Sequence, residues 1–388
     1  MRASCRLACA ECCADRLAAC EALAREGWCT RARRLTRELC AASCAHCGGG
    51  GGGAACADGL PACERWAARG ECARAAVREE CARSCGACAA APAAGGAAAA
   101  CGEAGGGGGA ALAPVVYGTA WKGARTAALV VRAFERGFRA FDTAAQPKHY
   151  HEAGLGEALR AIQAGGTHRR ELFVQTKFTP LRAQDATRLP YAANAPLRVQ
   201  VSQSINASLA NLHTDYLDSV LLHSPLATHA ETMEAWRALE QEVDEKRVRE
   251  LGVSNVESLD TLARLHADAR IKPSWVQNAF WPQSRFDGAL RIFCSMTGVG
   301  YQGYRLVAGN RRTIDSEYVE QVKRRMGDES PRASSEQAWF AIVKSLGVTP
   351  ITGSSTASHL EAALSGTTMK ELNASDVIEI ERWLDGFQ

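Results

Sequence analysis

Four titratable side chains of different kinds could act together on a carbonyl group. They are Asp142, Tyr150, Lys177 and His223. A free tyrosine, with a pKa of about 10, is a reluctant proton donor near neutrality. A neighbouring lysine ammonium stabilises the phenolate and so lowers the pKa of the phenol, while a carboxylate holds that lysine in place. Because a histidine can hydrogen-bond the same oxygen, this set is suited to protonating a carbonyl oxygen as a hydride reaches its carbon.

Short runs of β-branched residues alternate with amphipathic segments from residue 115 onward. Strands that alternate with helices predict a parallel sheet. Eight such units in about 270 residues fit a (β/α)8 TIM barrel, whose typical length is about 250 residues. Predicted helices include 198–212, 231–243 and 334–346. The predicted strands are Val115–Tyr117, Phe138–Phe141, Leu172–Thr176, Ser219–Leu222, Leu251–Val253, Trp275–Gln277, Val299–Gln302 and Val348–Ile351.

A doubly wound α/β sheet is the alternative to the barrel. Such a sheet usually carries a Gly-x-Gly-x-x-Gly phosphate-binding turn after its first strand. Here the first strand leads into the run from Gly118 to Gly123, which does not match, so the barrel is preferred. A barrel places its active site at the carboxyl ends of its strands. Asp142, Lys177 and His223 follow the second, third and fourth predicted strands, and Tyr150 lies in the loop after the second.

Several segments at these strand ends resemble the aldo-keto reductase superfamily. The resemblance covers about residues 114–386 and keeps the family's order of segments. It implies a barrel that binds NADPH and reduces a small carbonyl substrate. The matching segments are Gly137–Ala144, Thr176-Lys177, Leu221–Ser224, Gly252–Asn255 and Gln277-Asn278.

The resemblance also implies a role for each matching residue. Tyr150 would be the proton donor, and Lys177 and Asp142 would lower its pKa. His223 would position the carbonyl, and Tyr301 would stack on the nicotinamide ring. The other residues implied to lie at the cofactor are Gly118, Thr119, Ser254, Asn255 and Gln277.

The segment that carries Tyr150 is longer than the common family form. Tyr150 follows Asp142 by eight positions. Counted back from Gly156, His149 occupies the register in which the family has its tyrosine. Histidine cannot simply replace a phenol, and Tyr150 is the only tyrosine in the segment, so Tyr150 is the predicted donor.

A second departure lies after the last strand, where family members often carry a lysine and an arginine that clasp the NADP 2′-phosphate. Gly353 and His359 stand at those positions. Losing two fixed positive charges weakens phosphate binding, so NADH is an alternative to NADPH. Ser354 and Ser355 could still donate hydrogen bonds to the phosphate. The basic stretch 303–333 is predicted to be irregular, either a loop that covers the cofactor or a solvated segment.

The first 90 residues hold 15 of the 17 cysteines. Two six-cysteine units repeat with nearly the same intervals, and this pattern resembles the disulfide-knit ShKT module. The resemblance implies pairing of the first cysteine with the sixth, the second with the fourth and the third with the fifth. Zinc binding is the weaker alternative because no histidine pattern accompanies the cysteines. The twelve cysteines are Cys13, Cys20, Cys29, Cys40, Cys44 and Cys47, then Cys56, Cys63, Cys72, Cys81, Cys85 and Cys88.

These observations predict five segments. They are the tail of a truncated module (1–12, with Cys5, Cys9 and Cys12), two modules (13–47 and 56–88), an Ala/Gly linker (89–112) and the barrel (113–388). Disulfides favour the secretory pathway or the extracellular space. The sequence has no apolar leader, so we expect that truncation has removed a signal peptide.

Composition narrows the possible partners. A net charge of +3 gives no reason to expect nucleic acid as a partner, and no apolar run is long enough to span a membrane. Residues 1–112 contain neither lysine nor tyrosine, which argues against a channel-blocking role for the modules. The alternative to an enzyme is a non-catalytic cofactor-binding scaffold whose modules bind a partner protein.

Overall fold

The computed structural model describes residues 63–81, 84–86, 115–326, 333–369 and 372–386. The chain divides into two compact units, Met1–Ala111 and Leu112–Gln388, and each is described by itself. The second unit contains the barrel and the residues predicted to carry chemistry.

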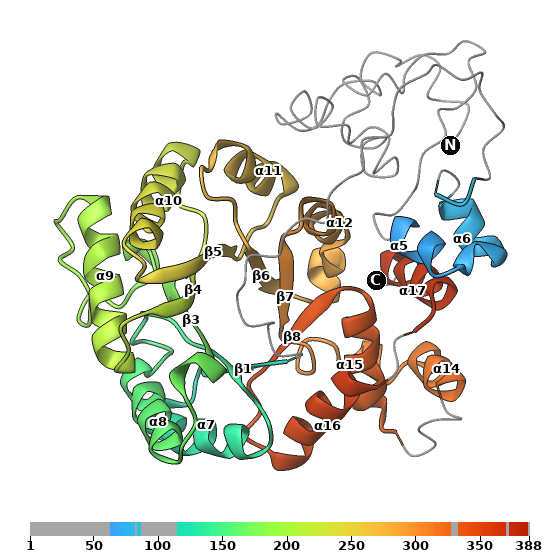
Figure 1. Ribbon diagram of the computed structural model, residues 1–388, viewed down its shortest axis with the longest axis horizontal. Coiled ribbons are helices and arrows are strands. Elements are labelled where there is room, and N and C mark those ends of the chain that lie inside the picture. Colours follow the sequence, from blue (N-terminus) through green and yellow to red (C-terminus); the bar gives the residue numbers. More distant parts are fainter. Residues whose placement is uncertain (1–62, 82–83, 87–114, 327–332, 370–371, 387–388) are drawn as a thin grey trace, which may run out of the picture. The chain divides into compact units, whose positions relative to one another are not determined.

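Eight parallel strands close into a barrel in the second unit (Figure 1). Each strand pairs with the next one along the chain, and β1 pairs with β8 to close the ring. The predicted (β/α)8 barrel is therefore confirmed. The strands are β1 (Val116–Gly118), β2 (Ala140–Asp142), β3 (Phe173–Phe178), β4 (Leu217–Leu222), β5 (Val248–Ser254), β6 (Trp275–Ala279), β7 (Gly300–Tyr304) and β8 (Val348–Thr352).

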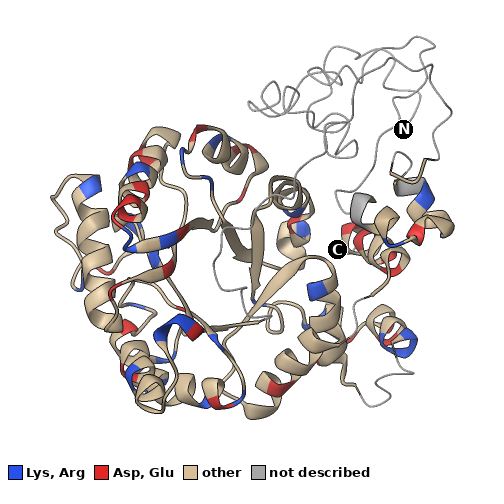
Figure 2. Ribbon diagram, in the orientation of Figure 1, with Lys and Arg blue, Asp and Glu red and all other residues tan. Residues whose placement is uncertain are grey.

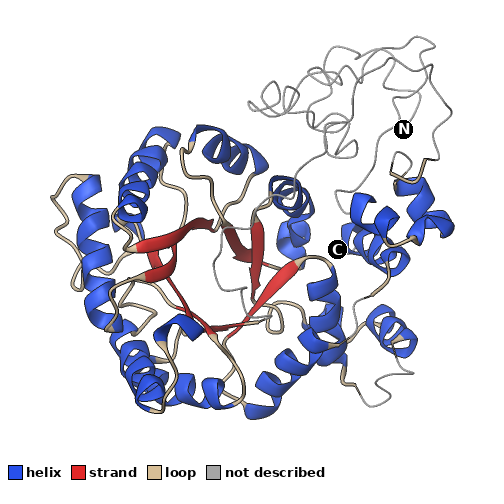
Figure 3. Cartoon of the chain, viewed as in Figure 1, coloured by secondary structure: helices blue, strands red, loops and turns tan. Residues whose placement is uncertain are grey.

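Helices surround the strands as an outer layer (Figure 3). Those that connect or follow the strands are α7 (Thr126–Glu135), α8 (Glu152–Ala164), α9 (Leu197–Leu212), α10 (His229–Asp244), α11 (Leu259–Asp268), α12 (Gly288–Thr297), α15 (Ser335–Ser345) and α16 (Ala357–Thr368). The described part of this unit also has α13 (Arg311–Ile314), α14 (Glu317–Arg325) and α17 (Ala374–Gly386). Short 3₁₀ turns are η3 (Gly123–Arg125), η4 (Arg169–Glu171), η5 (Leu181–Ala183) and η6 (Pro282–Asp287).

The strands are buried because helices cover their outer face and side chains fill the barrel. All six residues of β4 are buried, as expected for a strand enclosed on both faces. Capping residues mark the starts of two helices, α10 and α15. Thr228 at α10 and Ser334 at α15 each accept a hydrogen bond from the backbone N–H of the third helical residue. The side chain of that residue in turn accepts one from the backbone N–H of the cap.

Strand β7 runs two residues further than predicted. The prediction ended at Gln302, whereas the strand continues through Gly303 to Tyr304. A side chain at 303 would crowd Val348, since a Cβ there would lie 2.8 Å from its Cγ1. The small residue is thus required by the packing of β7 against β8, and it interrupts the apolar run from which the strand was predicted.

The stretch 303–333 is not wholly irregular, contrary to the prediction. It contains α13 and α14, and Ser316 caps the second of these. Val319 and Val322, three residues apart, are buried on one face of α14. Arg325 in the last turn of α14 pairs with Glu379 of α17 at 2.8 Å. These contacts give residues 311–325 of the basic segment a packed structure.

Basic and acidic positions are interspersed along the helices around the barrel (Figure 2). Among the described residues, no helix is long and apolar enough to cross a membrane.

The described part of the first unit belongs to the second cysteine module. Its elements are α5 (Cys63–Ala68), η2 (Glu71–Ala73) and α6 (Ala75–Glu80). Disulfides join Cys63 to Cys81 and Cys72 to Cys85. These are the second-to-fourth and third-to-fifth pairs, as the resemblance implied. The predicted Cys56–Cys88 pair, the first module, the truncated tail and the Ala/Gly linker lie outside the described residues.

Candidate active site

A cavity of about 730 Å³ opens at the carboxyl ends of the barrel strands. Eight of the twelve predicted catalytic and cofactor residues line it: Gly118, Asp142, Tyr150, His223, Ser254, Asn255, Gln277 and Ser354. Four do not: Lys177, Thr119, Tyr301 and Ser355. The cavity is also lined by Arg305 and Arg311 of the basic stretch 303–333. Other lining residues were not singled out from the sequence, among them Trp121, Lys122, Tyr304 and Glu336.

Asp142 and Lys177 form a buried ion pair at the inner end of the cavity. The Lys177 ammonium donates to Asp142 Oδ1 at 2.7 Å and Oδ2 at 2.6 Å, and to the Thr143 carbonyl at 2.9 Å. Burial lowers the pKa of Lys177, and the adjacent carboxylate opposes that shift. An ammonium has three donors. All three are used here. Asp142 and Lys177 are therefore adjacent as predicted, but Lys177 has no N–H left to donate to a phenol.

Tyr150 lines the cavity from the loop between β2 and α8. Its ring meets the His223 ring edge to face, with centroids 5.9 Å apart, and the Lys177 ammonium lies 5.2 Å from its centroid. Burial, and after it the Asp142 carboxylate, raises the pKa of Tyr150 above its ordinary value. The predicted lowering of this pKa is wrong for this structure, because burial and, after it, the Asp142 carboxylate disfavour the phenolate.

His223 reaches the cavity from the end of β4. Its Nδ1 lies 2.6 Å from Thr179 Oγ1, which leaves Nε2 for a group in the cavity. Burial, followed by the charges of Lys177 and His149, lowers the pKa of His223 to about 3. The imidazole is therefore neutral at physiological pH and suited to hydrogen bonding rather than to charge stabilisation.

Polar side chains of β5, β6 and β7 form one wall of the cavity. Ser254 Oγ donates to the Gln277 carbonyl at 2.7 Å. The Asn255 amide donates to the His223 carbonyl at 2.7 Å and accepts from the Tyr304 hydroxyl at 2.6 Å. Asn255 has a φ of +54°, a conformation that asparagine tolerates better than most residues.

Tyr301 was predicted to stack in the cavity, and that prediction is wrong. Tyr301 is buried, and its hydroxyl donates to Asp287 at 2.7 Å. Successive side chains of a strand point to opposite faces. Since Gln302 faces the barrel interior, Tyr301 faces outward and Tyr304 inward. Counting alternate residues along the full length of β7 would have identified Tyr304 as the tyrosine that faces the cavity.

Comparison with known proteins places this barrel among its relatives. The sequence profile described as "Aldo/keto reductase family" matches residues 114–385, more than half of the chain. The chain belongs to this family. The profile "ShK domain-like" matches residues 13–47 and 55–88.

Two named reductases are similar to part of this chain. The glyoxal reductase of Bacillus subtilis is 30% identical over 194 residues, covering 50% of this chain and 62% of that protein. The NAD(P)H-dependent D-xylose reductase of Pachysolen tannophilus is 28% identical over 216 residues, covering 49% of this chain and 63% of that protein. The chain thus spans less than two thirds of the length of these relatives.

Solved aldo-keto reductases share the fold. One from Brucella melitensis has a TM-score of 0.56 and 24% identity, covering 70% of this chain and 95% of that one. Another, complexed with NADPH, has a TM-score of 0.58 and 21% identity, covering 71% of this chain and 85% of that one.

His149 takes a different place from Tyr150 in this aldo-keto reductase. The His149 ring packs on the Trp121 indole, with centroids 3.7 Å apart, and does not line the cavity. The Trp121 amide also donates to the His149 carbonyl at 2.7 Å. Of the two candidates for the proton donor, Tyr150 is therefore the one that faces the cavity.

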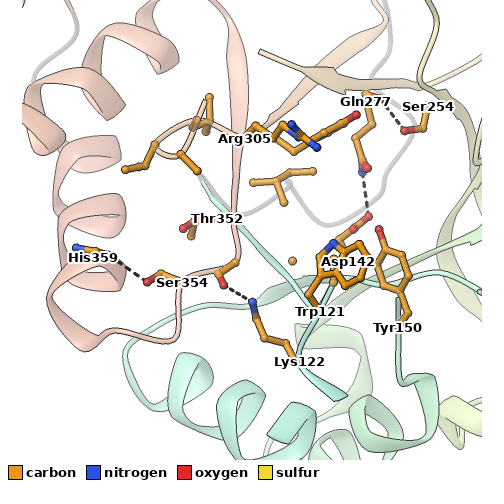
Figure 4. A pocket seen from close by; sticks show the side chains of 18 of the residues that line it. Trp121, Lys122, Asp142, Tyr150, Ser254, Gln277, Arg305, Thr352, Ser354 and His359 are labelled. Carbon is orange, nitrogen blue, oxygen red and sulfur yellow. Dashed lines mark hydrogen bonds between the residues drawn. The ribbon is translucent and has the colours of Figure 1, made fainter. Parts of the chain in front are cut away.

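Lys122 lies beside Gly353, the position at which a family lysine was expected from the sequence. A Cβ at Gly353 would lie 3.4 Å from Lys122 Nζ and 3.0 Å from the Gly118 carbonyl. The Lys122 ammonium donates to the Gly353 carbonyl and so joins the loops after β1 and β8. Figure 4 shows Lys122, Ser354 and His359 grouped apart from Asp142, Tyr150 and Gln277. The cavity thus has an inner end around Asp142 and an outer end around Lys122.

Proposed function

We propose that this protein reduces a small aldehyde or ketone to the alcohol with a nicotinamide dinucleotide. The observation that carries the proposal is that Tyr150, His223 and Gln277 line one cavity at the strand ends of an aldo-keto reductase barrel. Two relatives are named as a glyoxal reductase and a D-xylose reductase, and both names denote enzymes that act on small carbonyl compounds.

The residues present fit such a cofactor. Ser254, Asn255 and Gln277 offer hydrogen-bonding groups for a carboxamide, and Tyr304 takes over the ring-stacking role predicted for Tyr301. Lys122, Ser354 and His359 offer donors for phosphate at the outer end. A bound nicotinamide dinucleotide would supply the hydride. NADPH is the cofactor we propose, because Lys122 restores one of the two positive charges that the β8 loop lacks.

Tyr150 then supplies the proton. The phenol is protonated at physiological pH, and although its raised pKa makes it a weaker acid, it can donate to the carbonyl oxygen as negative charge develops there. Neutral His223 orients that oxygen through Nε2. The Lys177 ammonium, held by Asp142 at 5.2 Å from the Tyr150 ring, acts on the phenolate that remains through its charge and not through a hydrogen bond.

The test compares two single substitutions in the same loop. Tyr150→Phe removes the hydroxyl but keeps the ring, and we expect NADPH oxidation with a generic aldehyde to fall at least a hundredfold while cofactor binding is retained. His149→Phe keeps a ring on Trp121 and is expected to leave the rate within a few-fold of wild type. If only His149→Phe abolished turnover, the assignment of the donor would be wrong.

A non-catalytic, cofactor-binding scaffold is the second candidate. It is favoured by one observation: among the described residues, the Tyr150 hydroxyl makes no hydrogen bond to Lys177 or His223. Dinucleotide binding without turnover of any aldehyde would support the scaffold. The ShK-like modules would then bind a partner protein, and the segment 89–112 would act as their tether to the barrel.

We further propose that the protein works in an oxidising compartment, the secretory pathway or the extracellular space. The two disulfides Cys63–Cys81 and Cys72–Cys85 support this proposal, since such bonds persist where thiols are not kept reduced. Fractionation of expressing cells, with thiol labelling before and after reduction, tests it. Fully labelled cysteines in the native protein would place it in a reducing compartment.

A further inference from the structure

Three glutamine side chains meet inside the barrel beside Asp142. They are Gln175 on β3, Gln277 on β6 and Gln302 on β7. Gln175 and Gln302 are fully buried and do not line the cavity, whereas Gln277 does. Burying an amide is costly unless its donors and acceptors are paired. The hydrogen bonds of this cluster therefore determine how each amide is oriented.

Gln175 and Gln302 form a reciprocal pair. Gln175 Nε2 donates to Gln302 Oε1 at 2.9 Å, and Gln302 Nε2 donates back to Gln175 Oε1 at 3.1 Å. Gln175 Nε2 also donates to Asp142 Oδ1 at 2.7 Å. Because the carboxylate only accepts hydrogen bonds, Gln175 must present its nitrogen to it, and this fixes Gln302 in turn.

The pair dictates the orientation of the Gln277 amide. Gln277 Nε2 donates to Asp142 Oδ1 at 2.9 Å and to Gln302 Oε1 at 3.0 Å, which uses both of its hydrogens. A flipped amide would place its carbonyl oxygen against two other acceptors. Figure 4 shows the hydrogen bond from Gln277 to Asp142 on the cavity wall. Gln277 Oε1 is thereby left to accept a hydrogen bond from a ligand.

We propose that Gln175 and Gln302 are positioning residues, which hold Gln277 Oε1 ready to accept a hydrogen bond from the carboxamide NH2 of the nicotinamide cofactor. This inference rests on the function proposed above. The same Asp142 oxygen accepts from Lys177, so the cluster also ties the cofactor-binding amide to the ion pair near Tyr150. A cluster that only filled the barrel would affect stability but would not distinguish one dinucleotide from another.

The experiment measures dissociation constants for two probes by calorimetry. The probes are NADP⁺ and its 3-acetylpyridine analogue, in which a methyl group replaces the carboxamide NH2. We expect wild type to bind NADP⁺ about fivefold more tightly, the effect of one hydrogen bond. In Gln302→Met, which is similar in size but lacks the amide, we expect NADP⁺ to lose that advantage while the analogue binds as before.

Gln200→Met is the matched control. Gln200 is a buried glutamine of α9 that donates to the carbonyls of Ala193 and Ala195, away from the cavity. Its substitution should leave the ratio of the two dissociation constants unchanged. Should Gln302→Met fail to fold, Gln175→Met removes the other half of the pair and is expected to reduce the same ratio.

An unchanged ratio in a folded Gln302→Met or Gln175→Met protein would overturn the inference, as would equal affinity of wild type for the two probes. Either result leaves the proposed function standing. If wild type binds neither dinucleotide, the proposed function fails and this inference fails with it.

Discussion

The two ends of the cavity handle charge in different ways. At the inner end, Lys177 and Asp142 are 1% and 4% exposed, and each is held by several hydrogen bonds. At the outer end, His359 and Arg311 are exposed and Lys122 is half-buried. Buried charges need partners in fixed positions, whereas exposed charges are screened by salt and tolerate change. The charged groups of the inner end are thus held in fixed positions, whereas those of the outer end are suited to attracting an anion.

The largest effect is expected from Lys177→Met, which breaks the inner ion pair. An unpaired buried carboxylate at Asp142 should lower the free energy of unfolding by about 3–5 kcal/mol. Urea unfolding followed by circular dichroism measures this change. Lys148→Met, on the exposed surface of the neighbouring loop, is the control and should leave stability nearly unchanged. Adding Asp142→Asn to Lys177→Met should recover part of the loss; no recovery would mean that the two residues act independently.

The inner end could be predicted from the sequence, because the carboxyl ends of parallel strands meet at one rim. Asp142, His223 and Gln277 each follow or end a strand that was predicted from its short run of apolar and β-branched residues. The place of Tyr301 was misjudged because the predicted strand stopped at Gln302, before Gly303 and Tyr304, which complete β7. Lys122 was not found because it contacts Gly353, which is 231 positions away, through two loops whose conformations no periodicity encodes.

Acid should lower the stability of the folded protein through His223, which lies at the inner end of the cavity. The pKa of His223 in the folded protein is about 3, below the ordinary 6.5, so the unfolded chain binds the extra proton first as pH falls. The folded state is therefore destabilised as pH decreases from about 6.5 towards 3, by up to about 1.4 kcal/mol per pH unit. Urea midpoints measured across this range should fall less steeply for His223→Gln than for wild type. Parallel slopes would show that His223 does not contribute.

Lys122→Met tests the outer end. Removing a charged donor to phosphate should weaken NADPH binding about tenfold at low salt, and the difference should shrink as salt is added. Fluorescence titration with NADPH and with NADH measures the effect. A loss confined to NADPH would assign Lys122 to the 2′-phosphate, and an equal loss for both would assign it to the pyrophosphate. Affinity that is unchanged for both cofactors would remove Lys122 from the site.

The smallest effect is expected from Glu336, an acidic residue that lines the outer end of the cavity. Glu336 accepts a hydrogen bond from Arg311 at 2.7 Å, and its other oxygen lies 4.0 Å from His359 Nε2. Glu336→Gln removes a negative charge from an anion site without removing the hydrogen-bonding shape, so NADPH should bind about two- to threefold more tightly at low salt. At high salt the variant and wild type should converge. The same substitution should leave the free energy of unfolding within about 0.5 kcal/mol of wild type, in contrast to Lys177→Met, because the partner Arg311 is exposed and the pair is screened by solvent. A large loss of stability in Glu336→Gln would mean that the outer end, like the inner one, depends on fixed pairing of its charges.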